Sequence, residues 1–212
     1  MKLFLVLSLI LTAALLLVSY AGAGDLTPNE LGRVMILEYH KIDYPEERWT
    51  RTPENFRRDL ETLYAKGYRL VNLGDLLDRG PDPVGVLQLV RSLGAECVLG
   101  NHEEKHLRYA AHEARRRSDP RYRSPMRPFD PKRAAEHARL TRDDLLWLAG
   151  LPRWIVLGGR WVAVHGGLVP GVPLSAQPTD WAVKLRYVDA AGRPVSREAG
   201  DSRTPGVRRW AE

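Results

Sequence analysis

The sequence predicts an α/β fold, in which helices flank a sheet, and three observations support it. Short apolar runs alternate with longer amphipathic segments along most of the chain, as strands and helices do. Three of the apolar runs end in phrases rich in Gly, Asp, Asn and His, and ligands bind where the strands of an open α/β sheet end. The chain has 212 residues and 44% hydrophobic content, enough for one such domain with a sizeable core.

The first half of the chain is predicted to alternate between strands and helices. Cys97 lies inside one of the apolar runs, so we expect it to be a core residue rather than a nucleophile or a disulfide partner. The expected strands cover 34–39, 69–73 and 95–99, and the expected helices cover 53–66, 82–93 and 102–117.

The second half shows helix-cap and turn signals. Thr141 is a candidate N-cap, and Asp143 and Asp144 place negative charge in the first turn of a helix. Gly158-Gly159 is expected to form a hairpin turn. The expected elements after an irregular stretch over 118–130 are helices near 131–138 and over 141–150, strands over 153–157 and 161–165, and a further strand over Val183–Val188.

Three short phrases follow the apolar runs in a fixed order and define the candidate site. They are Gly74–Gly80 (GDLLDRG), Gly100–Glu103 (GNHE) and His165–Leu168 (HGGL). Asp, Asn and His side chains at three strand ends can supply oxygen and nitrogen ligands to divalent metals. Because a further carboxylate, a guanidinium and an imidazole lie beside them in the sequence, the pattern predicts a site for hydrolysis of phosphate esters.

The three phrases resemble the GDxxDRG, GNHE and HGG motifs of calcineurin-like metallophosphoesterases, in the phosphoprotein-phosphatase branch. The resemblance runs from about residue 74 onward and implies a partial metallophosphoesterase-type sheet. It implies that Asp75 bridges two metals and that Asn101 and His165 bind the second metal. Two divalent metals about 4 Å apart activate water and neutralise charge in this reaction. The implied metals are manganese, iron or zinc.

The same resemblance implies three catalytic residues. His102 acts near the leaving group, Asp78 orients His102, and Arg79 holds the phosphate. These residue types suit the chemistry, since a histidine donates a proton near neutral pH and a guanidinium presents paired donors to phosphate oxygens. The implied substrate is phosphorylated, either a phosphoprotein or a nucleotide.

Part of the family's pattern is missing from this chain. No Asp-x-His occurs upstream of Asp75, where the family's first motif supplies ligands to the first metal, and no histidine follows His165. The sequence therefore predicts an incomplete dinuclear site with weak or absent hydrolysis. Since Glu212 falls within the pattern of this branch, we expect a C-terminally truncated domain over 74–212.

Residues 24–73 resemble the opening of polysaccharide deacetylases, in the phrases Val34–His40, Thr52–Phe56 and Gly67–Val71. The Asp-Asp pair and the later histidines of that family's metal site do not occur in the right context. We therefore expect a fusion junction near Gly74 rather than a deacetylase.

Two residues near the N-terminus could replace the missing ligands of the first metal. Glu38-x-His40 ends the expected first strand and Asp75 ends the next, a βαβ placement. Glutamate can replace aspartate as an oxygen ligand, but its extra methylene shifts the reach by roughly 1 Å, a serious error in a preorganised site. An ordinary histidine at a strand end is the favoured interpretation.

A zinc-protease pattern overlaps the second phrase. His102–His106 fits H-E-x-x-H, and His112 lies at the offset of a third ligand, but Tyr109 stands where the extended pattern has a glycine. A continuous helix would also turn His112 away from the other two histidines. The protease is therefore the disfavoured alternative.

The N-terminus predicts export. Residues 1–23 combine Lys2, an apolar run over 3–18 and small residues at 21–23, as a secretion signal does. An uncleaved membrane anchor is the alternative. We therefore expect a secreted or periplasmic protein, whereas the phosphatases that it resembles are mostly cytoplasmic.

The net charge of +6 comes largely from arginine. A basic cluster after the second phrase can steer an anionic substrate, although a solvated surface is the simpler explanation. No aromatic interleaving or RNA-binding motif accompanies the cluster, so we predict no specific nucleic-acid binding. The cluster consists of Arg115, Arg116, Arg117, Arg121, Arg123, Arg127, Lys132 and Arg133.

These observations together predict a metal-dependent phosphoesterase of the phosphatase type. A non-catalytic, truncated fusion remnant is the first alternative. A cell-envelope polysaccharide deacetylase is the less favoured one.

Overall fold

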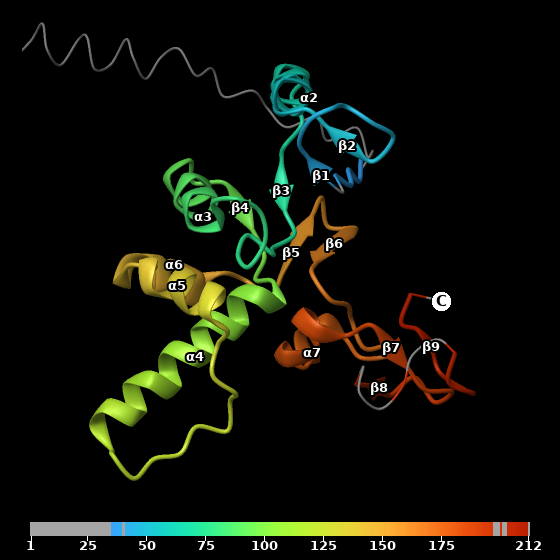
Figure 1. Ribbon diagram of the computed structural model, residues 1–212. Helices are drawn as coiled ribbons and strands as arrows, with labels where there is room; N and C mark the ends of the chain where they lie inside the picture. Colours follow the sequence, from blue (N-terminus) through green and yellow to red (C-terminus); the bar gives the residue numbers. More distant parts are fainter. Residues whose placement is uncertain (1–34, 40, 197–199, 201–202, 212) are drawn as a thin grey trace, which may run out of the picture. The chain divides into compact units, whose positions relative to one another are not determined.

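The computed structural model describes residues 35–39, 41–196, 200 and 203–211. The chain forms two compact units, Met1–Arg69 and Leu70–Glu212 (Figure 1). The predicted secretion signal over 1–23 lies outside the described residues. Among the helices of the described part, none is both long enough and apolar enough to cross a membrane.

The first unit is built around helix α2 (Pro53–Ala65), which confirms the helix predicted over 53–66. Thr52 caps it, since the hydroxyl accepts a hydrogen bond from the backbone N–H of Asn55, and Pro53 fills a first-turn position that needs no N–H donor. Strands β1 (Lys41–Ile42) and β2 (Thr50–Arg51) pair in parallel.

The strand predicted over 34–39 is wrong for the described residues 35–39, which form no regular structure. Ile36 is 84% exposed, so its apolar side chain is not used to pack against a sheet. An apolar run becomes a strand only where a neighbouring strand pairs with it. In the first unit, β2 pairs instead with β1, two residues further along the chain. Glu38 lies in this irregular segment, and His40 lies outside the described residues.

The second unit begins with a parallel βαβ arrangement. Strand β3 (Val71–Asn72) pairs with β4 (Glu96–Cys97), and helix α3 (Pro83–Ser92) connects them. Both strands are shorter than predicted, because the chain turns into the site loops soon after them. Cys97 is buried in the core, and burial raises the pKa of its thiol to about 12, which confirms a packing role.

Two glycines bring the loops after β3 and β4 into contact. Gly74 has a φ of +88°, and a Cβ added there would lie 2.5 Å from the backbone nitrogen of Gly100. A Cβ on Gly100 would lie 2.4 Å from the backbone nitrogen of Asp75. Since any side chain at either position would force the loops apart, these glycines place the first two polar phrases side by side.

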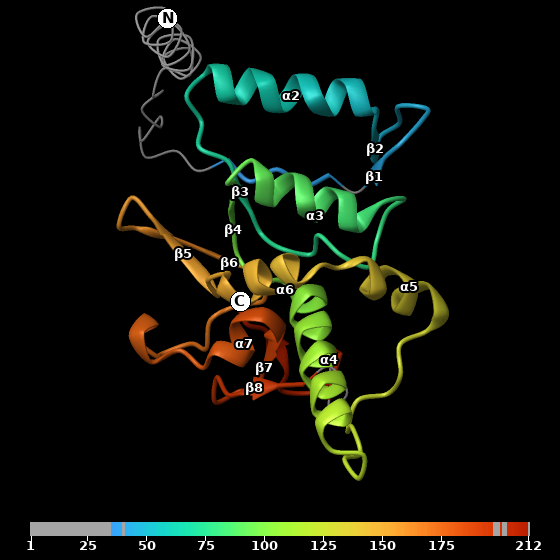
Figure 2. The ribbon, with the colours of Figure 1, turned by 90° about the vertical axis from the view of Figure 1, so that its left-hand side faces the viewer.

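Three helices complete the first part of this unit, as predicted. They are α4 (Asn101–Ser118), α5 (Pro131–Arg139) and α6 (Arg142–Gly150). Helix α6 contacts both α3 and α4, and α5 contacts α3 (Figure 2). Thr141 caps α6 through a reciprocal capping box with Asp144. The core between these helices contains Leu76, Leu77, Val84, Leu87, Cys97 and Leu148.

The predicted hairpin is confirmed. Strands β5 (Trp154–Leu157) and β6 (Trp161–Val164) pair in antiparallel fashion. Gly158 and Gly159 have φ angles of 52° and 67°, the left-handed conformation that a tight hairpin turn requires. The hairpin delivers His165, the residue after β6, to the site.

The strand predicted over Val183–Val188 is wrong at its start, because residues up to Lys184 belong to helix α7 (Thr179–Lys184). Ala182 and Val183 are adjacent and both buried, a pattern that a short helix packed on two sides satisfies as well as a strand. A small sheet follows, in the order β8-β7-β9, made of β7 (Tyr187–Val188), β8 (Pro194–Val195) and β9 (Arg208–Arg209). A 3₁₀ turn, η1 (Leu174–Ala176), precedes α7.

Candidate active site

Three side chains from separate segments meet at the ends of the strands. Asp75 follows β3, Asn101 begins α4, and His165 follows β6. His165 Nε2 lies 2.9 Å from Asn101 Oδ1 and 3.4 Å from Asp75 Oδ1. The Asp75 side chain is 36% exposed, so this group opens to solvent. The structure thus brings together the residues that the sequence predicts as metal ligands, and that role stays a prediction.

The orientation of the His165 ring determines which of its nitrogens faces the oxygens of Asn101 and Asp75. Its Nδ1 lies 2.7 Å from the backbone carbonyl of Leu73, and a carbonyl can only accept, so Nδ1 carries the hydrogen. In the neutral ring Nε2 is then an acceptor, and it faces the oxygens of Asn101 and Asp75. A cation placed among them would have one imidazole nitrogen and two oxygens as ligands, groups that divalent metals bind. The donor set therefore fits a divalent cation, and the bond from Nδ1 to a carbonyl is the usual support of a metal-binding histidine.

A buried glutamate holds the loop that carries Asp75. Glu103 is fully buried, and its carboxylate accepts hydrogen bonds from the backbone N–H groups of Asp75 (2.8 Å), Leu77 (2.9 Å) and Gly100 (3.1 Å). Sequence reasoning considered Glu103 only as the base of the disfavoured protease pattern. Its place as the third residue of α4, where a glutamate can bond back to the backbone N–H of the N-cap residue Gly100, is the signal that could have identified it.

The loop is held in a strained backbone conformation at two aspartates. Asp75 and Asp78 have φ angles of 58° and 71°, in the left-handed region that most residues with a side chain avoid. Each such residue costs about 1–3 kcal/mol and persists only where its surroundings fix it. The hydrogen bonds of Glu103 supply this restraint at Asp75.

Asp78 and His102 form a close pair. His102 Nδ1 lies 2.6 Å from Asp78 Oδ2, and the Asp78 side chain is only 1% exposed. The bond to Asp78 places the hydrogen on Nδ1 and directs His102 Nε2 toward the site, 3.7 Å from Asp75 Oδ2. The predicted approach of Asp78 to His102 is therefore present in the geometry, while the catalytic roles of the two residues stay predictions.

Asp78 is ionised in spite of its burial. Burial raises the pKa of the Asp78 carboxyl, but hydrogen bonds from Arg133, His106 and His102 outweigh it and hold the pKa well below its usual range. Arg133 Nε lies 2.6 Å and His106 Nε2 3.0 Å from Asp78 Oδ1. Sequence reasoning missed both partners, and it counted Arg133 with the basic surface cluster, which is wrong for this residue.

A second group of side chains could hold a metal. Asp78, His106 and Glu136 each offer a ligand atom, and these atoms lie within 4.8 Å of one another. Glu136 is buried, and its Oε1 accepts a hydrogen bond from the backbone N–H of Asp78 at 2.7 Å. Sequence reasoning considered His106 only as a zinc ligand in the disfavoured protease pattern and did not assign Glu136, since no motif connects it to Asp78.

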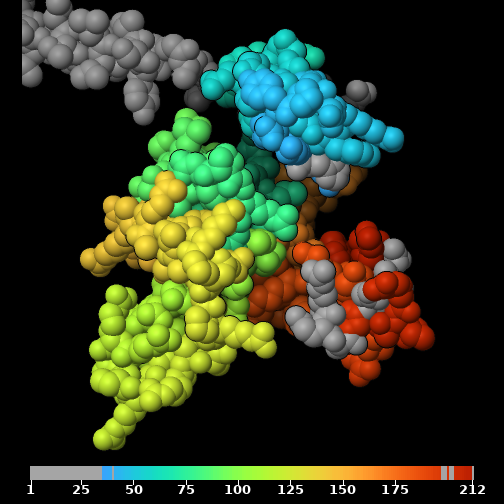
Figure 3. Space-filling model, in the orientation of Figure 1, coloured from blue at the N-terminus to red at the C-terminus, as the bar shows by residue number. Residues whose placement is uncertain are grey.

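Arg79, the predicted phosphate-binding residue, is exposed. Within the described part of the chain it makes no ion pair, so its guanidinium is accessible to an anion. In the basic cluster, three arginines lie on α4, three lie on the loop after it, and Lys132 and Arg133 lie on α5. Helix α4 and this loop project from the lower side of the space-filling view (Figure 3).

The zinc-protease arrangement is not formed. His102 and His106 bond to opposite oxygens of the Asp78 carboxylate instead of presenting free ring nitrogens to one cation. His112 hydrogen-bonds to the hydroxyl of Tyr122, on the loop after α4. The three histidines of the pattern therefore have separate partners.

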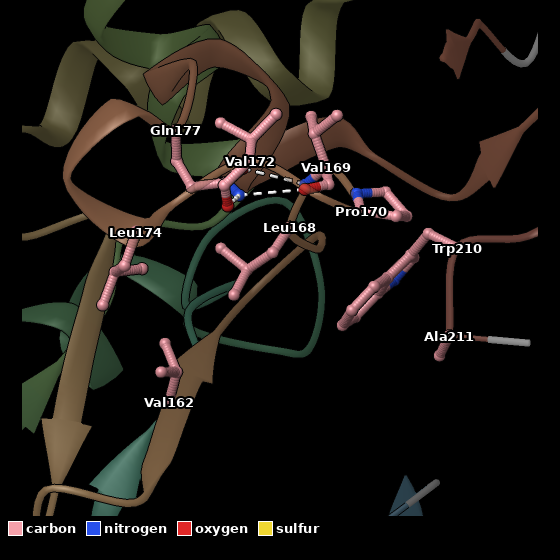
Figure 4. A pocket seen from close by; sticks show the side chains of 9 residues that line it. All are labelled: Val162, Leu168, Val169, Pro170, Val172, Leu174, Gln177, Trp210 and Ala211. Atoms are coloured by element: carbon pink, nitrogen blue, oxygen red, sulfur yellow. Dashed lines mark hydrogen bonds between the residues drawn. The ribbon is translucent and has the colours of Figure 1, made fainter. Parts of the chain in front are cut away.

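A cavity of about 380 Å³ lies beyond the His165 loop (Figure 4). Leu168 and Trp210 point into it, and Gln177 bonds to both backbone groups of Val169 at its edge. Its lining contains no titratable side chain, so it is separate from the candidate catalytic groups. The lining residues are Val162, Leu168, Val169, Pro170, Val172, Leu174, Gln177, Trp210 and Ala211.

The fold and this group of side chains define a metallophosphoesterase. The family model described as calcineurin-like phosphoesterase matches residues 39–199, and the chain belongs to this family. The match begins before Gly74, within the segment that resembles deacetylases. The deacetylase resemblance of 24–73 and the junction near Gly74 stay predictions.

Two curated proteins resemble this chain over about half of its length. It is 53% identical over 117 residues to serine/threonine-protein phosphatase 1 of Salmonella typhimurium, covering 55% of this chain and 39% of that protein. It is 39% identical over 108 residues to the symmetrical bis(5'-nucleosyl)-tetraphosphatase of Aromatoleum aromaticum, covering 49% of this chain and 35% of that protein. The chain thus spans less than half the length of either relative.

A solved structure shares the fold. The crystal structure of a protein designated a diadenosine tetraphosphatase superposes with a TM-score of 0.54 at 24% identity, covering 73% of this chain and 62% of that one. This similarity confirms the predicted fold class, a mixed α/β arrangement with small sheets and flanking helices.

Proposed function

We propose that this protein is a metal-dependent phosphatase of the protein serine/threonine phosphatase type, with an incomplete dinuclear metal site. One observation carries the proposal. Nε2 of His165 lies 2.9 Å from Asn101 Oδ1 and 3.4 Å from Asp75 Oδ1, and these three groups together fit a divalent cation. The paired Asp78 and His102 lie directly beside it.

Asp75, Asn101 and His165 would hold a divalent manganese, iron or zinc ion. When bound, such an ion polarises a phosphoryl oxygen and stabilises the charge that develops during displacement. Arg79, which is exposed and follows Asp78 in the chain, would bind the remaining phosphoryl oxygens through paired N–H donors.

His102 would protonate the leaving alkoxide from Nε2. For this its ring must carry hydrogens on both nitrogens, and the Asp78 carboxylate 2.6 Å from Nδ1 stabilises that positive charge. Asp78 also fixes the ring orientation, so that Nε2 is presented to the site rather than to the protein interior.

The proposed site lacks part of the ligand set of a first metal. Asp75 is the bridging residue by resemblance, yet no Asp-x-His precedes it. Glu38-x-His40 is the disfavoured substitute, and His40 lies outside the described residues. A single cation cannot clamp both the attacking and the leaving oxygen, so we expect turnover that is lower by a few powers of ten than a complete site gives.

The test is hydrolysis of p-nitrophenyl phosphate with manganese supplied. We expect slow turnover that Asn101→Ala abolishes and that Glu38→Ala leaves unchanged. Fast turnover that is lost in Glu38→Ala or His40→Ala would instead make that pair a working substitute. Turnover that is absent, together with no manganese binding, would favour a non-catalytic remnant.

The substrate class is open between the two kinds of relative. A phosphoserine peptide and a symmetrical dinucleoside tetraphosphate, compared at equal concentration, would decide it, and we expect the phosphopeptide to be preferred. We also propose that the protein is exported. Cleavage near residue 23 in a fractionated cell, measured by N-terminal sequencing, would support a secreted or periplasmic location over an uncleaved anchor.

A further inference from the structure

A buried histidine beside the candidate site has no part in the function proposed above. His106 is fully buried, on the helix that carries Asn101 and His102. Its Nε2 lies 3.0 Å from Asp78 Oδ1, and its Nδ1 lies 3.1 Å from Nδ1 of His137 on α5. Both ring nitrogens are therefore occupied, one by the carboxylate and one by a second imidazole.

The direction of the hydrogen bond to Asp78 follows from what each group can do. The ionised Asp78 carboxylate only accepts, so His106 Nε2 carries a hydrogen and donates it to Asp78 Oδ1. The other ring nitrogen, Nδ1, pairs with Nδ1 of His137. Burial, and next the charge of His106, lower the pKa of His137. His106 thus connects helix α5 to the Asp78 carboxylate.

Helix α5 holds the same aspartate at two further points. Arg133 Nε donates to Asp78 Oδ1 at 2.6 Å, and Glu136 Oε1 accepts from the backbone N–H of Asp78 at 2.7 Å. Asp78 has the left-handed φ of 71°, and these contacts fix both its backbone and its carboxylate plane. Arg133, Glu136 and His137 lie within about one turn of one helix, so a single element supplies all three contacts.

These contacts also weigh against a metal at Asp78, His106 and Glu136. The candidate ligand atoms already have hydrogen-bond partners: Asp78 Oδ1 accepts from two donors and Glu136 Oε1 from one. The Arg133 guanidinium, 2.6 Å from Asp78 Oδ1, supplies the positive charge that a cation would otherwise bring. A second cation at this point would be repelled.

We propose that His106, supported by His137, Arg133 and Glu136 of helix α5, is a positioning residue. It binds one carboxylate oxygen of Asp78 so that the other oxygen stays on Nδ1 of His102 and directs His102 Nε2 at the leaving group. The inference rests on the proposed function for its catalytic consequence. The orientation of the His102 ring can be measured independently of any turnover.

The test compares two substitutions at one position. His106→Leu removes the donor, whereas His106→Gln keeps an amide N–H near the place of Nε2. We expect His106→Leu to lower kcat for p-nitrophenyl phosphate about 10- to 100-fold, with KM nearly unchanged, and His106→Gln to restore most of this loss. His112→Gln is the matched control on the same helix, since His112 bonds Tyr122 and not Asp78, and it should leave kcat unchanged.

Nitrogen-15 spectra of the imidazole rings give the readout that does not depend on activity. In the wild type, His102 should show one tautomer, with the hydrogen on Nδ1. His106→Leu should give a mixture of tautomers, and His106→Gln should return the single form. If the wild type shows one tautomer but no turnover, the positioning inference stands while the proposed function fails.

His137→Phe is a second variant that tests the proposal if the His106→Leu chain does not fold. Phenylalanine keeps the ring contacts that His137 makes with Tyr109 and Phe129 but removes the hydrogen bond to His106. We expect a loss of a few-fold in kcat with an unchanged KM. Equal losses in His106→Leu and His106→Gln would overturn the proposal, as would an unchanged His102 tautomer in His106→Leu. The loss of one bound metal per chain in either variant would overturn it too, in favour of a metal site.

Discussion

Two carboxylates in one loop, Asp75 and Asp78, have opposite surroundings. Asp75 is partly exposed and faces other acceptors, the Nε2 of His165 and the oxygen of Asn101. Asp78 is buried, and its carboxylate accepts hydrogen bonds from His102, His106 and Arg133. Asp75 therefore lies among groups that fit a divalent cation, whereas the charge of Asp78 is balanced by side chains of the chain itself. The comparison divides the site into an open half around Asp75 and a buried half around Asp78.

The largest expected effect comes from the open half around Asp75. Asp75→Asn removes the charge that a cation needs, so we expect at least a hundredfold loss of manganese-dependent hydrolysis. Manganese at 100 times its dissociation constant should stabilise the wild type by about 2.7 kcal/mol and Asp75→Asn hardly at all, as thermal unfolding would measure. Asp180→Asn, at an exposed position of α7, is the control. Equal stabilisation of wild type and Asp75→Asn would remove the distinction between the two carboxylates.

Asp78→Asn should lower the stability of the fold and leave the stabilisation by manganese unchanged. It leaves Arg133 and two histidines without their buried partner, which costs about 3 kcal/mol of unfolding free energy, measured by urea denaturation. Manganese should still stabilise this variant as it stabilises the wild type, because the proposed metal ligands are untouched. A loss below 1 kcal/mol would mean that the buried half is not assembled as described.

A smaller effect should appear at Asp144, a buried carboxylate away from the site. Burial raises the pKa of Asp144, but hydrogen bonds from Gln88 and Thr141 and the charge of Arg91 hold it below its usual range. A lowered folded pKa means that Asp144 contributes stability above the unfolded pKa of about 3.9 and loses it as pH falls through the folded pKa. The difference in stability between wild type and Asp144→Asn should therefore shrink from pH 5 toward pH 2. Asp143→Asn, at the exposed neighbouring position, should show no such trend.

The sequence predicted the elements whose signals are local. The N-cap Thr141, the glycine pair at 158–159 and the amphipathic run of α2 each depend on near neighbours, and these elements form as expected. The apolar run over 35–39 failed as a strand because pairing depends on a partner elsewhere in the chain. The same limit applies to Val183, where burial alone does not distinguish a short helix from a strand.

In the candidate site, too, residues within local motifs were predicted and residues brought close by tertiary packing were not. The predicted ligands and catalytic residues could be chosen because they belong to short motifs that follow strands. The glycines at 74 and 100 bring the first two of these motifs together. The supporting residues His106, Arg133 and Glu136 could not be predicted, since they reach Asp78 across 28, 55 and 58 positions of the chain. Only the packing of α5 and α4 around the loop makes them neighbours.

The buried carboxylate of Glu103 has a consequence for anyone who moves this loop into another protein. Its two oxygens accept from amides in two loops, so the length of one side chain sets the spacing between them. Shortening it to aspartate would withdraw those oxygens by roughly the 1 Å that a preorganised site does not tolerate. Gly74, Gly100 and Glu103 therefore need to be transplanted as one unit, before any of the residues that carry the chemistry.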